Sequence, residues 1–472
     1  MSTLPEKFVG IQISPVSFID EGVEQVLDTL QQRVGVNVLL IGTISWLGLK
    51  VGRRISAALE GWPDHGIAAP YTMRGGSYIA PHPAYYANTP IREFRATDPE
   101  MVGKDILEMI IPAARARGMQ VIPEFMEPLF KYAGHGSANN VHIPNMPQYL
   151  EVDLLGRLGA EPCTSTPAYR TWWHSIVEDH CRSYDIEGIM WCNERNSPID
   201  RMVAGLPPTC FCATCRQEAI DRGIDVERVR IAFRELWGYF QAARTGQPFV
   251  DGSAIEFLRV LLRNPEVLIW ERFWLERSKD LDRELYGIVK WCNPASSFGL
   301  NVWNRNHFNP IRKAQWSWAE QTDYCDWVKP ITYQHQAGAV YTKEMNDLHL
   351  SILRDFTPEE LTPLMFKLLG LNEASWPELF QSGMDPDTYV YGQCVDAVRG
   401  VAGNAAVYMG IGVDAPRTRA DQAVCTPDIV YRSVHATYRA GGKGVVFSPN
   451  YSGMNLSNLD GASRALTELG LR

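Results

Sequence analysis

The sequence of 472 residues contains no apolar stretch of the ~18 residues that a membrane-spanning helix requires. It also has no excess of positive charge, because 45 lysines and arginines stand against 54 aspartates and glutamates, for a net charge of −9. Binding to nucleic acid needs a basic surface that neutralises phosphates. We therefore expect neither a nucleic-acid partner nor a membrane. The first residues lack the charged and then apolar pattern of a secretory signal, so we expect a cytoplasmic protein.

Internal repeats, low-complexity tracts and linkers rich in serine, glycine or proline are also absent. The ten histidines include no H-x-x-x-H pair, so no catalytic metal is expected. Hydrophobic residues make up 45% of the chain, which is enough for a large core. Strand-like and helix-like segments alternate from end to end. This alternation favours a single α/β domain over residues 1–472.

Eight apolar runs predict eight strands, the number needed for a (β/α)8 barrel, also called a TIM barrel. They are residues 9–14, 36–41, 120–125, 189–192, 298–303, 327–333, 405–410 and 443–448. Two insertions interrupt the pattern, a loop over about 45–98 and a cysteine-rich, helical region over about 205–290 with two or three helices. Asp98-Pro99-Glu100 is typical of a helix start.

Asn193 and Glu194 directly follow the fourth predicted strand. In a (β/α)8 barrel the carboxyl ends of the strands carry the catalytic groups, whereas the opposite ends contribute mainly to stability. Glu194 is therefore the candidate general acid. A salt bridge to Arg195 or an exposed position at the strand end would be the structural alternative.

Cys210, Cys212 and Cys215 form a C-x-C-x-x-C motif just beyond this strand. Thiolates at this spacing can share one soft cation, and tetrahedral zinc needs a fourth ligand. Cys163, in an upstream loop, is the preferred fourth ligand, and Cys192 is the alternative. Zinc closed off by four thiolates has no open coordination position, so its expected role is structural.

The region from Cys163 to about residue 236 resembles glycoside hydrolase family 42, the β-galactosidase-like family of the clan A barrels. Residues 163–170 are similar to the family's Cys-Pro-Asn-Ser-Pro-x-Tyr-Arg segment, and residues 193–194 are similar to its Asn-Glu pair at the end of strand four. The C-x-C-x-x-C motif is similar to its remaining zinc ligands, and residues 233–236 are similar to the helix beyond. The resemblance implies a (β/α)8 barrel with Glu194 as the acid/base.

The chain departs from this family at the nucleophile. Clan A enzymes carry a glutamate at the end of strand seven, whereas here the only acid in residues 408–414 is Asp414. Hydrolysis of a glycosidic bond needs two carboxyl groups, so Asp414 is the preferred second one. Glu127, which follows strand three, and Asp326, which precedes strand six, are the alternatives.

Polar and aromatic residues at the predicted strand ends are candidates for binding a sugar, because pyranose rings stack on aromatic faces. They are Trp46, Glu127, Asn193, Asn301, Trp303, Tyr333 and Tyr451. Asn193 is the expected partner of the sugar's 2-hydroxyl. The sequence therefore predicts a glycosidase that hydrolyses a small oligosaccharide or glycoside with two carboxylates. A carbohydrate-binding barrel without catalysis and a sugar-acid lyase or isomerase are the alternatives. The partners considered for the protein are a carbohydrate substrate and further copies of the chain in a homo-oligomer.

Overall fold

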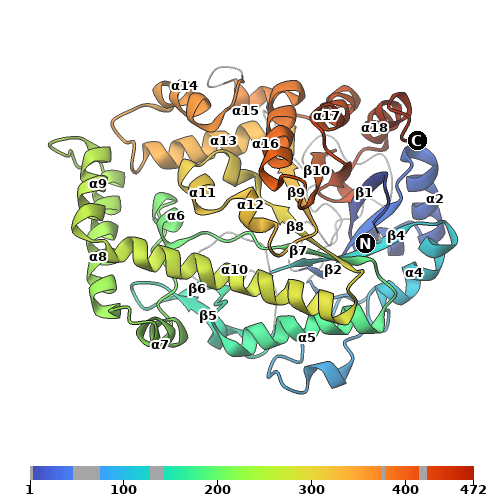
Figure 1. Ribbon diagram of the computed structural model, residues 1–472, viewed down its shortest axis with the longest axis horizontal. Coiled ribbons are helices and arrows are strands. Elements are labelled where there is room, and N and C mark those ends of the chain that lie inside the picture. The colour runs from blue at the N-terminus through green and yellow to red at the C-terminus, as the bar shows by residue number, and fades with distance from the viewer. Residues whose placement is uncertain (1–3, 46–74, 128–142, 374–377, 414–422) are drawn as a thin grey trace.

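The computed structural model describes residues 4–45, 75–127, 143–373, 378–413 and 423–472 (Figure 1). Eight parallel strands form a closed barrel, because each pairs with the next and the last pairs with the first. They are β1 (Phe8–Ile13), β2 (Val38–Ser45), β4 (Gln120–Met126), β7 (Gly188–Cys192), β8 (Ser297–Val302), β9 (Trp327–Thr332), β10 (Ala406–Gly412) and β11 (Gly444–Ser448). Each overlaps one predicted strand. The predicted (β/α)8 fold is confirmed.

Helices connect the strands and surround the barrel (Figure 1). Those on the side of the chain termini pack in sequence around the ring, α17 against α18, α18 against α2 and α2 against α4. No helix of the described ranges is long and apolar enough to span a membrane. The connecting helices outside the β7–β8 and β8–β9 crossovers are α1 (Pro15–Asp20), α2 (Val23–Val34), α4 (Ile106–Ala116), α5 (Pro167–Ser183), α13 (Gln334–His349), α14 (Pro358–Leu369), α15 (Leu379–Ser382), α16 (Tyr391–Val401), α17 (Pro427–Arg439) and α18 (Leu456–Glu468).

The connection from β7 to β8 contains more helical residues than any other described connection between barrel strands. Its helices are α6 (Pro198–Val203), α7 (Ala213–Asp221), α8 (Val226–Arg244), α9 (Ser253–Arg263) and α10 (Glu266–Cys292). Four helices occupy 213–292, where the sequence predicted two or three. The additional breaks have local causes, since Gly223 takes a positive φ of 76° and Pro265 disrupts the helical ladder between α9 and α10. α10 returns along α5 to the start of β8 (Figure 1).

The helix predicted to start at Asp98 starts later. Residues 99–103 form turns, and Gly103 has a φ of 76°, which a continuing helix does not allow. α4 begins only at Ile106, where the Asp105 carboxylate accepts hydrogen bonds from the backbone nitrogens of Leu107 and Glu108. The N-cap of α4 is therefore the second of two nearby aspartates.

Large and small side chains alternate in the barrel interior. Phe8 stacks on Tyr408 with ring centroids 3.9 Å apart, and Trp327 packs beside both. Gly299 leaves the space that the Trp327 indole occupies, because a Cβ atom at position 299 would lie 2.1 Å from two of its ring atoms. The buried apolar cluster of the interior consists of Phe8, Val38, Leu40, Ile122, Met126, Met190, Cys192, Trp327, Tyr408 and Val446.

We predict that Gly299→Ala destabilises the protein by about 1–3 kcal/mol, because the added methyl overpacks the indole. The matched control is Gly287→Ala in α10, where a Cβ atom would meet nothing within 4 Å. That change should stabilise the protein by roughly 0.5–1 kcal/mol through helix propensity. Denaturant unfolding of the two variants measures both effects. Equal stability of Gly299→Ala and the wild type would contradict this packing.

Candidate functional site

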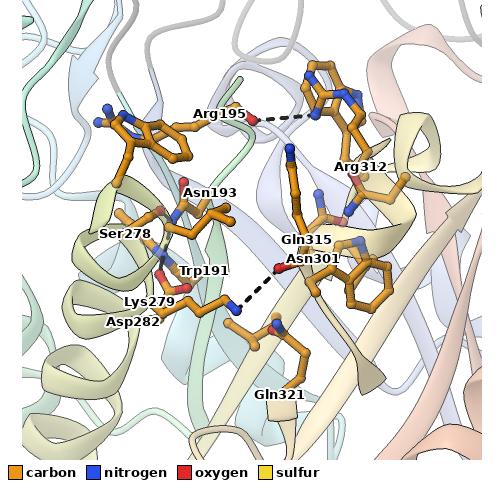
Figure 2. A pocket seen from close by; sticks show the side chains of 17 residues that line it. Trp191, Asn193, Arg195, Ser278, Lys279, Asp282, Asn301, Arg312, Gln315 and Gln321 are labelled. Atoms are coloured by element: carbon orange, nitrogen blue, oxygen red, sulfur yellow. Dashed lines mark hydrogen bonds between the residues drawn. The ribbon is translucent and has the colours of Figure 1, made fainter. Parts of the chain in front are cut away.

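The side chains of β7 alternate between the barrel interior and the surrounding helices. Met190 and Cys192 belong to the interior cluster, whereas Trp191 belongs to the core between the barrel and the helices. Continuing the alternation past the strand directs Glu194 inward and Asn193 outward. Asn193 accordingly donates its amide hydrogens to Ser278 and Asp282 of α10, each at 3.1 Å (Figure 2).

Glu194 is held by an oriented chain of two side chains. The Asn301 amide nitrogen donates to Glu194 Oε1 at 3.0 Å, and Lys329 Nζ donates to Asn301 Oδ1 at 2.9 Å. An ammonium group can only donate hydrogen bonds, so the Asn301 oxygen must face Lys329 and its NH2 group must face Glu194. The amide thus presents a donor to the carboxyl group of Glu194 and fixes its position at the carboxyl end of the barrel.

The hydrogen-bonded side chains next to Glu194 continue across the barrel interior and form one polar layer. Lys329 Nζ lies 3.4 Å from the Tyr333 hydroxyl, which donates to Gln12 at 3.4 Å. Gln12 in turn donates to Glu124 Oε1 at 2.7 Å. Glu124 is a buried, inward-facing carboxylate in the same half of the barrel as the partly buried Glu194, and sequence reasoning missed it in favour of Glu127. Strand alternation could have identified it, because Glu124 and Ile122 are two residues apart on β4 and their side chains therefore both face the barrel interior.

Toward the carboxyl end of β10, the seventh barrel strand, the two inward positions are Gly410 and Gly412, and neighbouring groups lie close to both. A Cβ atom at Gly410 would lie 3.0 Å from Lys329 Cε, and one at Gly412 would lie 2.7 Å from His335 Cε1. The Lys329 side chain therefore covers the space next to Gly410. Two predicted site residues, Asp414 and Trp46, lie outside the described residues.

Glu127 and Arg195 form a buried ion pair. The guanidinium donates to Glu127 through Nε at 2.5 Å and Nη2 at 2.7 Å, and Tyr169 adds a hydroxyl donor at 2.8 Å. Arg195 Nη1 also donates to the Pro162 carbonyl at 2.7 Å. Burial disfavours the cation, but Glu127 outweighs it, and the pKa of Arg195 lies well above its ordinary value. The bonding capacity of Glu127 is thus directed at Arg195 and Tyr169.

The four predicted metal ligands converge next to Pro162. Sulfur atoms of Cys163, Cys210, Cys212 and Cys215 all lie within 4.8 Å of one another. Cys163 Sγ is 3.4 Å from Cys215 Sγ and 3.6 Å from Cys212 Sγ. A tetrahedral thiolate site with metal–sulfur bonds of ~2.3 Å has edges of about 3.8 Å, so this cluster can hold one metal ion.

Local structure creates this convergence. Cys163 follows β6 (Leu158–Pro162), which pairs with β5 (Leu150–Val152), and Cys212 is the N-cap of α7. The backbone nitrogen of Phe211 donates to the Val152 carbonyl at 2.7 Å and ties the motif to the hairpin. Cys192 lies apart in the barrel interior, where its thiol contacts Glu124 at 3.4 Å. It is not in the metal-type cluster.

Three further residues that the sequence predicted for the site, Trp303, Tyr451 and Asp326, contact charged side chains. Trp303 follows β8 and lies under two guanidinium groups, those of Arg305 and Arg312, at 4.8 and 4.9 Å. Tyr451, in η5 (Tyr451–Gly453), donates its hydroxyl to Glu21 at 3.1 Å. Asp326 precedes β9 and pairs with Lys290 at 2.8 Å, on the side of the barrel opposite to Glu194.

Comparisons with known proteins address the fold. No family model and no curated protein matches the sequence. Solved structures do match: an α-L-fucosidase from Paenibacillus thiaminolyticus (11% identity, TM-score 0.50), a β-galactosidase from Marinomonas ef1 (11%, 0.51) and a β-galactosidase from the haloarchaeon Halorubrum lacusprofundi (14%, 0.54). Each alignment covers 98% of this chain.

The chain shares the barrel fold of these glycoside hydrolases. The resemblance to β-galactosidase-like barrels that the motifs indicated is confirmed at this level. This chain spans only 49%, 59% and 58% of the length of the three enzymes. At such low identity, the likeness defines the architecture of the protein, and its chemistry must be argued from the site.

We predict that Arg195→Met destabilises the protein by about 3–5 kcal/mol, because it leaves the Glu127 carboxylate buried and without its cation. Adding Glu127→Gln should restore part of the loss by removing the unpaired charge. The control is Arg272→Met, at an exposed pair whose arginine side chain is 82% accessible, with an expected cost of about 0–1 kcal/mol. Unfolding in denaturant at neutral pH measures all three. A loss for Arg195→Met no larger than for the control would refute the role of this pair.

Proposed function

We propose that the protein is a glycoside hydrolase in which Glu194 is the general acid/base. The observation that carries this proposal is the inward direction of Glu194 at the carboxyl end of β7, fixed by the Asn301 amide. A general acid has to meet the leaving oxygen at a defined position, and barrel enzymes place that position at the carboxyl ends of the strands. The pairing of Arg195 with Glu127 supports the proposal, because it leaves Arg195 engaged elsewhere than at Glu194.

For the second carboxylate we propose Asp414, which stands two positions after the last residue of β10 in the sequence. Glu124 is the alternative, because it belongs to the same inward polar layer as Glu194. Tyr333 and Asn301 line this layer and offer hydroxyl and amide groups to a sugar. Galactosides and fucosides are the substrate classes to test first, given the names of the enzymes that share the fold.

A sugar-binding barrel without hydrolysis is the second candidate. It is favoured by the two glycines of β10, since Lys329 covers the space next to Gly410, where an inward carboxylate of this strand would lie. This candidate predicts sugar binding at the barrel mouth with no turnover of any glycoside.

We propose zinc as the ion held by Cys163, Cys210, Cys212 and Cys215. Four largely buried thiols within 4.8 Å of one another suit zinc in a structural role. Such an ion would fasten the α7 loop to the β5–β6 hairpin. It would supply stability and no reactive coordination position.

We predict that Glu194→Gln lowers turnover of glycosides with poor leaving groups by roughly 10²–10⁴-fold, because positioned proton transfer is worth about that much. An activated aryl glycoside needs little protonation and should lose less in the bond-breaking step. Asp414→Asn should impair both substrate types alike. Steady-state kinetics on a 4-nitrophenyl galactoside, a 4-nitrophenyl fucoside and their alkyl counterparts measure the difference.

Glu93→Gln, at an exposed position, is the matched control for these variants and should keep full turnover. Full activity of Glu194→Gln on every substrate that the wild type cleaves would rule out the acid assignment. Full turnover by Asp414→Asn would instead make Glu124 the leading candidate for the second catalytic carboxylate.

We predict one zinc ion per purified chain, measured by elemental analysis. Cys212→Ser should reduce the metal content and lower the thermal midpoint, because a closed thiolate site contributes folding free energy. Cys394→Ser is the control, since Cys394 is buried between α16 and α17 and lies outside the cluster. Stoichiometric metal and unchanged stability in Cys212→Ser would contradict the assignment.

A further inference from the structure

A cavity of about 130 Å³ lies beside the barrel mouth, between α10 and the segment that follows β8 (Figure 2). A single water molecule needs only about 10–15 Å³ on this scale, so the cavity has room for a small organic molecule. Its wall toward the barrel includes Asn301, the residue that holds Glu194, and Asn193. Beyond β8 the chain forms η3 (Asn304–His307), α11 (Pro310–Gln315) and α12 (Trp318–Gln321), which close the opposite side.

Indole rings make up much of the lining. Four tryptophans border the cavity, namely Trp191, Trp274, Trp303 and Trp316. Trp303 and Trp316 are partly exposed, so the cavity communicates with solvent on their side. Indole rings offer flat apolar faces against which the C–H face of a pyranose ring packs. Trp191 is fully buried and two guanidinium groups lie over Trp303, so Trp274 and Trp316 are the rings left for this contact.

The positively charged groups of the lining already have carboxylate partners. Lys279 Nζ pairs with Glu320 at 2.7 Å, and Arg195 pairs with Glu127. Arg312 Nε lies 3.6 Å from Asp200. Asp282 accepts hydrogen bonds from Trp191 and Asn193, and burial raises its pKa to about 7. The three cations of the lining are therefore already paired, and burial favours the neutral form of Asp282.

Neutral hydrogen-bonding groups remain available. The side-chain amides of Asn306 and Gln321 line the cavity and make no hydrogen bond within the described part of the chain. The Ser278 hydroxyl accepts from Asn193, so its own proton is free to be donated. Each amide offers both a donor and an acceptor, as neighbouring sugar hydroxyls require.

We propose that this cavity is a binding site for a neutral sugar unit, separate from the barrel mouth. Indole faces provide the apolar contact, and Ser278, Asn306 and Gln321 bind hydroxyl groups. The site goes beyond the proposed hydrolysis and does not require Glu194 to be catalytic. It gives the protein a second contact with a saccharide next to the position where the bond would be cleaved.

The test measures binding in the Glu194→Gln background, so that no probe is consumed. Isothermal titration uses D-galactose, L-fucose and lactose as probes. Gln321→Leu and Asn306→Leu should each weaken binding by about 2- to 10-fold, the usual worth of one hydrogen bond. Ser278→Trp should weaken binding more than tenfold by filling the cavity. Gln247→Leu, at an exposed glutamine remote from the cavity, should leave the affinity unchanged.

Circular dichroism and the thermal midpoint verify that each variant is folded, and the two leucine variants keep the test valid if Ser278→Trp does not fold. Unchanged affinity in folded Gln321→Leu and Asn306→Leu would overturn the proposal, because the sugar would then bind elsewhere. Absence of binding of all three probes up to tens of millimolar would overturn it as well. Lack of glycoside turnover in the wild type, by contrast, would contradict the proposed hydrolysis. It would not contradict the sugar site, provided that the cavity variants still weaken sugar binding.

Discussion

The candidate site depends on the ion pair between the buried guanidinium of Arg195 and the carboxylate of Glu127. Arg195 immediately follows Glu194 and binds the carboxylate of Glu127, at the end of β4, together with the carbonyl of Pro162, next to the first cysteine of the cluster. Three segments far apart in the sequence thus meet at one cation. A buried arginine without its carboxylate is costly, so this pair restricts the end of β7 to one arrangement. Glu194, the preceding residue, lies on this restricted segment, and the Asn301 amide then orients its carboxyl group.

The cysteine cluster reinforces the same constraint from outside the barrel. Pro162 ends β6 and accepts from Arg195, and Cys163, the next residue, belongs to the group of four thiols. A bound ion would fix the hairpin, the hairpin would fix the carbonyl, and the carbonyl orients the guanidinium. The metal-type site can therefore affect the geometry of Glu194 without contributing to the chemistry, which agrees with a closed coordination shell.

Local patterns in the sequence were sufficient for the fold and for part of the site. Apolar runs located all eight strands, and the C-x-C-x-x-C spacing identified cysteines that the structure brings together with Cys163. The Arg195–Glu127 pair joins residues 68 positions apart, and no local pattern encodes such a partner. The choice of Glu127 over Glu124 failed to use strand parity, which directs Glu124 inward. Helix α4 begins at the later of two capping aspartates, and the deciding feature was the positive φ of Gly103.

The polar layer of the barrel interior limits where a second catalytic carboxylate can be placed. Lys329 places a cation beside Gly410, in the region where β10 would carry an inward carboxylate, and its partner Asn301 is also the partner of Glu194. A second carboxylate must then reach the sugar from beyond β10 or from Glu124 on β4. The separation of that carboxylate from Glu194 decides between a covalent intermediate and direct attack by water. The stereochemical outcome of cleavage would thus report the distance between Glu194 and the carboxylate that acts with it.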